Sequence, residues 1–249
     1  MRAFDPIAGV SVPTSICNLK DLQSLQRIEA TRDLAENLKQ LKLLKTLHLS
    51  KVQQCFMPEL CASVAMLPYL TNLAISAINN DEVLNLNFLD PLPDLEMLHI
   101  RGRMEMKILP RVFDSFHKLR RLHLYWSGLK EDPLCHLAHM SNLVFLCLIK
   151  TYDGELLTFR KVYFPNIRDL ILMDMAQLVA IEIEDGTMIN LEYLQLTGLQ
   201  GLKCVPEGLY FLGELQRVVL QDMPEAFVEK LRGEESRFIQ HVPHVIYRD

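Results

Sequence analysis

Pairs of apolar residues that flank a single intervening residue recur along the chain. The eight pairs are Leu47/Leu49, Leu73/Ile75, Leu98/Ile100, Leu122/Leu124, Leu146/Leu148, Leu170/Leu172, Leu194/Leu196 and Val218/Leu220. From the second residue of one pair to the second residue of the next, the intervals are 26, 25, 24, 24, 24, 24 and 24 residues. Because alternate side chains of a strand point to opposite faces, both members of a pair enter the core and the residue between them faces outwards. The pattern predicts one short strand per repeat.

Apolar residues at intervals of three precede these pairs, as in Leu38, Leu41, Leu44 and in Phe113, Phe116, Leu119. This spacing is typical of helical or 3₁₀ turns. Three such ladders begin three residues after a proline, which favours a turn start there. A 24-residue unit of this kind has the length of a leucine-rich repeat. We therefore predict an α/β leucine-rich-repeat solenoid, with a curved parallel β-sheet on the concave face and short helical or 3₁₀ turns on the convex face.

The repeats predict one domain over residues 1–249, with about nine units, a partial repeat in 1–15 and a C-terminal cap in 224–249. The first unit carries Arg27 where the second apolar residue of a pair is expected. At the other end, Phe227 and Leu231 have the spacing of one face of a short amphipathic helix. Because no polar cap precedes the first unit, we expect a fragment or truncation of a longer solenoid.

The asparagine that usually follows the paired leucines is missing. Apolar residues occupy the position three after the second leucine in several units: Val52, Ile78, Met175, Leu199 and Met223. We expect apolar packing to replace the usual polar ladder there.

Composition and charge exclude several classes of protein. Hydrophobic residues make up 49% of the chain and charged residues 23%, with a formal net charge of -5, which is typical of a globular protein and argues against a nucleic-acid partner. With no run of eighteen apolar residues and no secretory signal, we expect no membrane span and a cytoplasmic location. Six scattered cysteines and the absence of an Asn-x-Ser/Thr sequon also favour a reducing compartment.

Several sequence motifs of the chain resemble those of a known family. Residues 180–249, with GTM-x-NLE, VPEGL and HVPHVIYRD, and the stretch SICNLKDLQSLQRIEA near the start are the most specific parts of this resemblance. They resemble the C-terminal leucine-rich repeats of cereal (monocot) coiled-coil nucleotide-binding disease-resistance proteins. In that family a nucleotide-binding domain acts as a switch, and the repeats restrain it until a pathogen effector or a modified host protein is sensed. The resemblance implies the sensing part for this chain.

The switch itself is not implied. A phosphate-binding loop requires Gly-x4-Gly-Lys-Ser/Thr, and Gly208 and Gly213 have the glycine spacing but are followed by Glu214 instead of lysine. No coiled-coil heptad run occurs either. The sequence therefore predicts repeats that lack the nucleotide-binding domain.

The outward residues of the strands predict the binding surface, because a leucine-rich repeat presents them on its concave face. Arginine and aromatic residues, which are enriched at interface hot spots, gather in the middle repeats. The predicted partner-binding residues are Arg101, Arg121, His123, Tyr125, Trp126, Phe145 and Lys150, and Trp126 is the only tryptophan. The alternative is that these are ordinary solvated positions and that Trp126 folds over a neighbouring loop.

Charge is unevenly distributed along the repeats. Residues 101–122 contain seven basic and two acidic side chains, whereas residues 174–192 contain five acidic side chains and no Lys or Arg. Segregated charge of this kind would steer or orient a partner. Two ordinary solvated faces are an equally good interpretation.

Enzyme signatures are absent. Cys135, His136 and His139 lie close together, but their apolar neighbours belong to the repeat ladder and turn them outwards on the convex side, so we expect no metal site. No catalytic residues, cofactor or small-molecule substrate are predicted. The resemblance to the resistance proteins implies a protein-binding recognition module of plant innate immunity that senses its partner through the concave face. The alternatives are a structural or autoinhibitory clamp on a receptor nucleotide-binding domain, and a truncated receptor paralogue with little activity.

Overall fold

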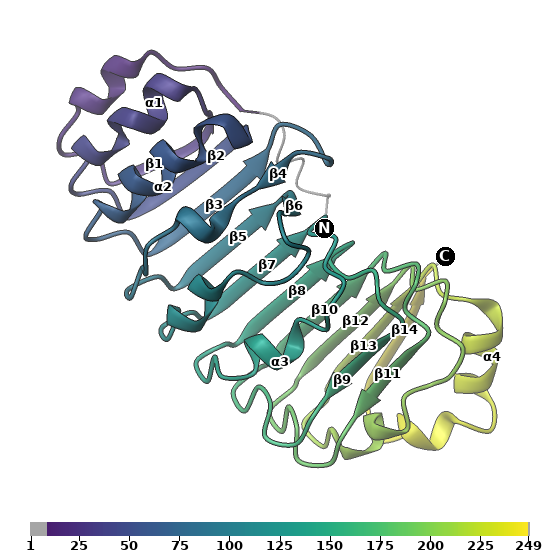
Figure 1. The fold of residues 1–249 in the computed structure, drawn as a ribbon. Helices are drawn as coiled ribbons and strands as arrows, with labels where there is room; N and C mark the ends of the chain where they lie inside the picture. The colour runs from purple at the N-terminus through teal and green to yellow at the C-terminus, as the bar shows by residue number, and fades with distance from the viewer. Residues whose placement is uncertain (1–8, 249) are drawn as a thin grey trace. The chain divides into compact units, whose positions relative to one another are not determined.

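The computed structural model describes residues 9–248 and divides the chain into two compact units (Figure 1). Unit 1 takes in the described residues up to Leu119, and unit 2 those from Arg120 onwards. The two units are described separately below.

Unit 1 is built on four parallel strands in the order β1-β2-β3-β5. Their bounds are Ser24–Glu29 for β1, Thr46–Val52 for β2, Asn72–Ala77 for β3 and Met97–Arg101 for β5. The short strands β4 (Val83–Leu84) and β6 (Arg103–Met104) pair with each other. The helical segments are η1 (Thr14–Asn18), α1 (Arg32–Asn37), η2 (Leu38–Gln40), η3 (Gln54–Phe56), α2 (Met57–Ala65), η4 (Leu86–Phe88) and η5 (Arg111–Ser115).

Unit 2 contains six parallel strands in the order β7-β8-β10-β12-β13-β14. They are β7 (Arg121–Tyr125), β8 (Phe145–Ile149), β10 (Asp169–Met173), β12 (Tyr193–Thr197), β13 (Arg217–Gln221) and β14 (His244–Arg248). The connections contain β9 (Leu156–Phe159), β11 (Ala180–Ile183), α3 (Leu134–Leu137), η6 (Glu207–Phe211), α4 (Glu225–Arg232) and η7 (Ser236–Phe238). In each unit the connecting segments lie on one face of the sheet (Figure 1). We call the other face of the sheet the open face.

The repeat register predicted from the leucine pairs is confirmed. In unit 2, Leu122 pairs with Leu146, Leu146 with Leu170 and Leu170 with Leu194. All sixteen members of the eight pairs are at most 3% exposed. Each strand therefore contributes two apolar side chains to the core, which lies between the sheet and the connecting segments. The predicted leucine-rich-repeat fold, with a parallel sheet and short helical turns, is what each unit shows.

The prediction that proline starts a helical turn is also confirmed. Pro13, Pro110 and Pro206 immediately precede η1, η5 and η6. Each has an extended backbone, and the turn begins at the next residue. The fixed φ of proline thus marks the start of the connection in both units.

The prediction for the first unit is wrong in one respect. Its strand does contribute an apolar pair, because Leu25 lies opposite Leu47 and Ile28 lies opposite Leu49. The register shifts between Leu25 and Ile28, and Arg27 adopts a left-handed backbone at φ 56°. A β-bulge of this kind places one extra residue on one strand, so Ile28 takes the place that simple alternation gave to Arg27.

The expected loss of the polar ladder holds only for some units. Val52, Met175 and Leu199 are at most 1% exposed, in agreement with apolar packing. At the same position Thr151 is fully buried, and its hydroxyl donates a 2.6 Å hydrogen bond to the carbonyl of Leu124. A second set of polar contacts lies in the turns before the strands. There the side-chain amides of Asn166 and Asn190 donate to the carbonyls of Ser141 and Pro165, at 2.8 and 2.7 Å.

The connections of unit 2 include a feature that the interval of three did not predict. Strands β9 and β11 pair in parallel, with Leu157 opposite Ile181 and Phe159 opposite Ile183. Leu157 and Phe159 are fully buried. Two neighbouring repeats therefore close their core with a small second sheet, where other repeats use a helical turn.

The end of the described chain contains a helix and a strand. The predicted amphipathic helix is α4, and its residues Phe227 and Leu231 are each 1% exposed. Strand β14 pairs with β13, and Tyr247 lies opposite Leu220. The guanidinium of Arg232 on α4 lies 4.3 Å from the centre of the Tyr247 ring, so a cation–π contact links helix and strand.

Candidate functional site

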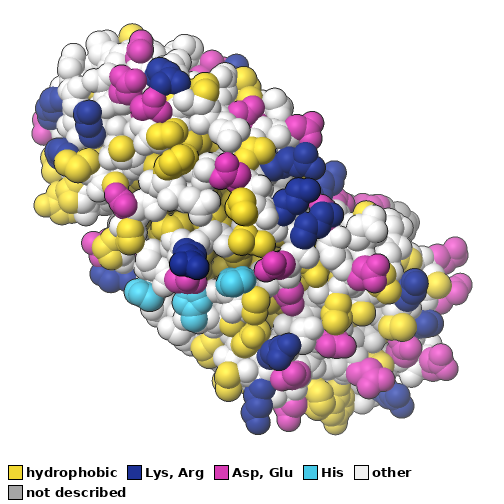
Figure 2. All heavy atoms as spheres, in the orientation of Figure 1, with side chains coloured by type: hydrophobic (Ala, Val, Ile, Leu, Met, Phe, Trp, Pro, Cys, Tyr) yellow, Lys and Arg dark blue, Asp and Glu magenta, His cyan; other side chains and the backbone are white. Residues whose placement is uncertain are grey.

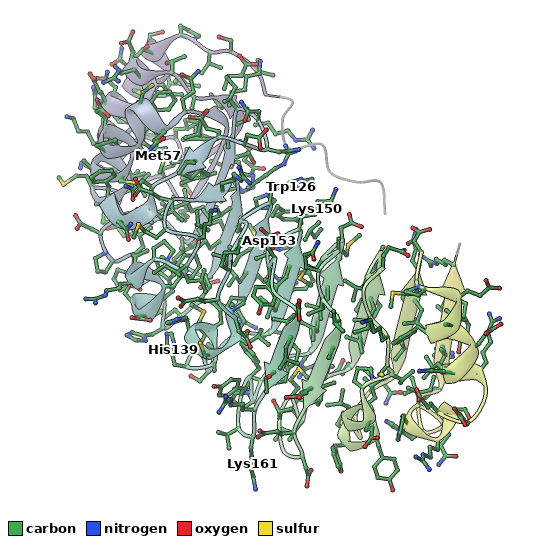
Figure 3. All side chains as sticks on the ribbon, turned by 45° about the vertical axis from the view of Figure 1, so that its right-hand side comes forward. Met57, Trp126, His139, Lys150, Asp153 and Lys161 are labelled. Atoms are coloured by element: carbon green, nitrogen blue, oxygen red, sulfur yellow. The ribbon has the colours of Figure 1, made fainter. Side chains whose placement is uncertain are left out.

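Strands β7 and β8 position most of the predicted partner-binding residues. Arg121 lies opposite Phe145, His123 opposite Cys147 and Tyr125 opposite Ile149. These six side chains alternate with the buried leucines of the two strands, and they therefore lie on the open face of unit 2. Trp126 and Lys150 directly follow their strands at one edge of this face (Figure 3).

The aromatic side chains at the start of this face form one connected cluster. The rings of His123 and Phe145 have centroids 4.7 Å apart, and those of Tyr125 and His123 are parallel at 6.2 Å. The guanidinium of Arg121 lies 5.9 Å from the centre of the Phe145 ring. Arg121 is exposed, while His123, Tyr125 and Phe145 are half-buried. The cluster thus presents a connected aromatic surface with one exposed cation beside it.

The edge residues Trp126 and Lys150 share an unusual backbone conformation. Their φ angles are 55° and 50°, in the left-handed region that non-glycine residues seldom adopt. The N–H of Trp126 donates to the carbonyl of Ile149 at 2.9 Å, and that of Lys150 donates to Met173 at 3.0 Å. Each left-handed residue therefore adds a last rung to the parallel ladder before the chain leaves the sheet.

The same position in the next repeats belongs to Asp174 and Gly198, with φ angles of 55° and 62°. The ammonium group of Lys150 lies 5.6 Å from the centre of the Trp126 ring and 4.0 Å from a carboxylate oxygen of Asp174. A Cβ on Gly198 would lie 2.3 Å from that carboxylate, so the glycine leaves room for Asp174. A row of contacts thus runs along the edge from Trp126 to Gly198.

Burial sets the protonation of the titratable groups in the cluster. Burial, followed by the nearby charge of Arg121, lowers the pKa of His123 to about 4. Burial raises the pKa of the Cys147 thiol to about 12 and also raises the pKa of Tyr125. At neutral pH all three groups are uncharged. The cluster therefore offers polarisable neutral surface, and Arg121 supplies its charge.

Arg101 differs from the other six predicted residues. It belongs to unit 1, at the end of β5, and it is only 5% exposed. Its guanidinium donates a 2.7 Å hydrogen bond to the side-chain oxygen of Asn80. Arg101 thus belongs to unit 1 and is buried, while the other six predicted residues share one region of unit 2.

Three apolar residues extend the cluster and were not among the predicted residues. Ile149, Ile171 and Met173 are half-buried on the open face, and Ile149 lies opposite Met173 in the β8–β10 register. The sequences of β8 (FLCLI) and β10 (DLILM) indicate this extension, because their outward positions are apolar as well as their inward ones. We define the open-face patch by Arg121, His123, Tyr125, Phe145, Ile149, Ile171 and Met173.

The cysteine and histidines in and directly after α3 lie elsewhere. Leu134, Leu137 and Met140 are at most 1% exposed, whereas Cys135, His136 and His139 are exposed, as the ladder predicted. Figure 3 places His139 well away from Trp126 and Lys150. In the described part of the chain, residues 9–248, no group of three His, Cys, Asp or Glu side chains could hold a metal ion.

Ion pairs within each unit reduce the charge contrast that the sequence showed. Lys118 pairs with Asp94 at 2.6 Å and Arg103 with Asp81 at 3.6 Å. On the acidic side, Glu192 pairs with Arg168 at 3.0 Å. On the face seen in Figure 2, acidic and basic side chains accordingly occur next to one another in several places. Because these charges are paired locally, we interpret the charged side chains of both segments as ordinary solvated surface.

Comparison with known proteins places these features in context. The family model described as "Leucine-rich repeat region" matches residues 6–235. Disease resistance protein RPM1 of Arabidopsis thaliana is 30% identical over 239 residues, which cover 96% of this chain and 26% of that protein. Probable disease resistance protein RXW24L of the same plant is 27% identical, with coverage of 92% and 25%. The chain thus spans about a quarter of the length of these relatives.

Two solved structures show the same fold at low sequence identity. The structure of the TLR13-ssRNA13 complex has a TM-score of 0.60 and 20% identity, and the match covers 94% of this chain and 37% of that one. The LRR ectodomain of the plant receptor kinase GASSHO1/SCHENGEN3 from Arabidopsis thaliana, in complex with CASPARIAN STRIP INTEGRITY FACTOR 2, has a TM-score of 0.52 and 15% identity. That match covers 95% of this chain and 31% of the ectodomain.

Proposed function

The chain belongs to the leucine-rich repeat family, and we propose from this premise that it is a protein-recognition module of plant defence. In this proposal the open face of unit 2 senses a pathogen effector or a host protein that an effector has modified. The similarity to plant disease resistance proteins supports the role in defence. The resemblance to the cereal coiled-coil nucleotide-binding receptors supports a sensing role within a larger receptor.

The observation that carries the proposal is the open-face patch. It combines the ring contacts of His123 and Phe145 with the exposed cation of Arg121, and these residue types are enriched among interface hot spots. The aromatic rings are fixed by their neighbours, so little side-chain entropy is lost when a partner covers them. A pre-organised, partly apolar surface of this kind favours protein binding over solvation.

We further propose that the module works in the cytoplasm. All six cysteines are free, and three of them, Cys55, Cys135 and Cys204, are exposed. Exposed free thiols are typical of reducing compartments. Separately, no helix within residues 9–248 is long and apolar enough to cross a membrane.

A binding measurement against a panel of candidate effector proteins tests the proposal. The intact chain and a triple variant, Arg121→Ala with Tyr125→Ala and Trp126→Ala, are compared by co-precipitation and by interferometry. We expect at least one effector to bind the intact chain and to lose at least tenfold in affinity with the triple variant. A matched control carries His136→Ala, His139→Ala and Arg160→Ala, three exposed positions outside the patch, and is expected to bind normally.

The outcome also separates the alternatives. Circular dichroism and a thermal melt establish that both triple variants are folded. Effectors that bind the triple variant as well as the intact chain would exclude the open-face patch as the recognition surface. Binding to a receptor nucleotide-binding domain instead of any effector would favour the clamp.

A further inference from the structure

We infer that the open face of unit 2 binds an acidic protein segment that carries an apolar anchor residue. This inference rests on the proposed function and names the chemistry of the partner at the same surface. Two features of the face carry it: an apolar centre on β8 and β10, and arginines on both sides of that centre.

The apolar centre lies where the two strands run side by side. Cys147 lies opposite Ile171 and Ile149 opposite Met173. Phe145, Ile149, Ile171 and Met173 are half-buried, so each keeps apolar surface in contact with water. An apolar side chain from a partner would remove this surface from water, which is the main favourable contribution to protein association.

Arginines flank the centre on both sides. Arg121 lies on β7, and its guanidinium is next to the Phe145 ring. On the other side Arg217 on β13 and Arg248 on β14 lie close enough to Tyr193 to lower its pKa, against a larger rise caused by burial. Within residues 9–248, no carboxylate oxygen lies within 4.0 Å of these three guanidinium groups.

The other charges near the centre are largely compensated. Lys150 at the edge is paired with Asp174 and lies over Trp126, so its charge is engaged within the protein. Asp169 is the one carboxylate on the open-face positions of the six strands, and burial raises its pKa. Three arginines against one aspartate give this face a positive balance, although the whole chain carries -5. Charge complementarity therefore favours an acidic partner.

The register sets the spacing that such a partner requires. From β7 to β13 the sheet crosses four strand intervals, which is roughly 19 Å at about 4.8 Å per interval. An extended segment that crosses the strands covers this distance with about six residues at roughly 3.3 Å each. The fitting segment therefore has two acidic positions about six residues apart, with an apolar residue between them.

A nucleic acid fits this face less well. A polyanionic backbone requires cations along its whole path, and the centre of the face has aliphatic residues where phosphates would lie. The apolar centre is instead suited to a side chain such as leucine, phenylalanine or methionine. Single-stranded RNA is retained as a comparison in the test.

The test is a selection of random 12-residue peptides by mRNA display on the immobilised intact chain. We expect the enriched peptides to share two Asp or Glu residues about six positions apart and an apolar residue between them. Arg121→Glu and Ile171→Asp are each expected to weaken a selected peptide at least tenfold, and binding should decline with ionic strength. The matched controls Arg160→Glu and Ile189→Asp, at exposed positions outside the open face, are expected to stay within twofold of the intact chain.

Several results would overturn the inference. The selected peptides could be basic or uncharged, or no peptide could be enriched. The selected peptides could also bind both face variants as well as the intact chain. Finally, a 12-nucleotide RNA could bind the intact chain and lose its binding in Arg121→Glu. Arg121 is exposed, so Arg121→Glu remains informative if Ile171→Asp does not fold. If effectors respond to the Arg121, Tyr125 and Trp126 triple variant but peptides show no acidic preference, the inference alone fails. If neither effectors nor peptides respond to that variant, the proposed function fails as well.

Discussion

The ammonium group of Lys150 lies 5.6 Å from the centre of the Trp126 ring, and both residues hold a left-handed backbone at the ends of neighbouring strands. The left-handed conformation costs an L-residue roughly 1 to 2 kcal/mol. At this position the N–H completes the parallel ladder, so the sheet offsets part of the cost. The contact fixes the orientation of the only tryptophan in the chain at the edge of the open-face patch.

Removal of the ammonium group should therefore be visible in tryptophan fluorescence. Lys150→Ala is expected to shift the emission of Trp126 to longer wavelength and to increase its quenching by acrylamide, because the ring loses its cover. We expect a loss of about 0.5 to 1 kcal/mol in the free energy of unfolding, typical of an exposed cation–π pair. Lys51→Ala is the matched control, since Lys51 is also left-handed at φ 54° and pairs with Glu29. A spectral change of equal size in both variants would refute the specific contact.

His123 predicts a loss of stability in mild acid. Its pKa is about 4 in the folded protein, because burial and then Arg121 disfavour the charged ring, and its ordinary value is 6.5. Between these two values the unfolded chain binds more protons than the folded one, so stability falls as the pH drops through this window. At about 1.4 kcal/mol per pKa unit, the effect is on the order of 3 kcal/mol.

Urea unfolding at pH 7.5, 5.5 and 4.5 measures this effect. His123→Gln should lose less stability than the wild type over that range, because glutamine takes up no proton. His136→Gln, at an exposed position on α3, should follow the wild type. Parallel curves for the wild type and His123→Gln would show that His123 does not titrate as described.

The six cysteines should fall into two reactivity classes. Cys17, Cys61 and Cys147 are at most 3% exposed, and burial raises their pKa, for Cys61 and Cys147 to about 12. Cys55, Cys135 and Cys204 are exposed, and within this group partial burial and then Asp132 raise the pKa of Cys135, so it should be the slowest of the three. Because the thiolate is the reactive form, we expect iodoacetamide at pH 8 to label the exposed group at least tenfold faster.

Peptide mapping by mass spectrometry at several times distinguishes the six sites. The denatured chain serves as the control, in which all six should react at similar rates. Early labelling of Cys147 in the folded chain would contradict the burial of the middle of the open face.

The sequence predicted the repeat architecture because each strand must bury the same pair of apolar side chains. Leu122 and Leu146 occupy equivalent positions in units of equal length, so one register explains both. Arg27 escaped this reasoning, since a bulge depends on pairing with the next strand and changes which residue points inwards. The position of a bulge is set by pairing with a strand that lies far away in the sequence, so local spacing does not indicate it.

The candidate site was predictable only in part, for a similar reason. Arg121 and Phe145 could be assigned to one face by alternation alone. Arg101 is buried and donates a hydrogen bond to Asn80, and no spacing rule indicates either feature. Alternation also assigns Ile171 and Met173 to the outward face, but they were left out of the predicted site because only arginine and aromatic residues were selected there.

Gly208 is predicted to be required for the approach of η6 to β11. A Cβ at this position would lie 2.0 Å from the carbonyl oxygen of Ile183, a backbone atom that cannot move aside without disturbing the strand. Gly208→Ala should therefore lower the free energy of unfolding by about 1 to 3 kcal/mol, as other overpacked sites do. Gly213 lies five residues further on and has no atom within 4 Å of the equivalent position, so Gly213→Ala should be neutral or slightly stabilising. Thermal melts of the two variants decide the point. Equal melting temperatures would show that the two segments do not pack as closely as described.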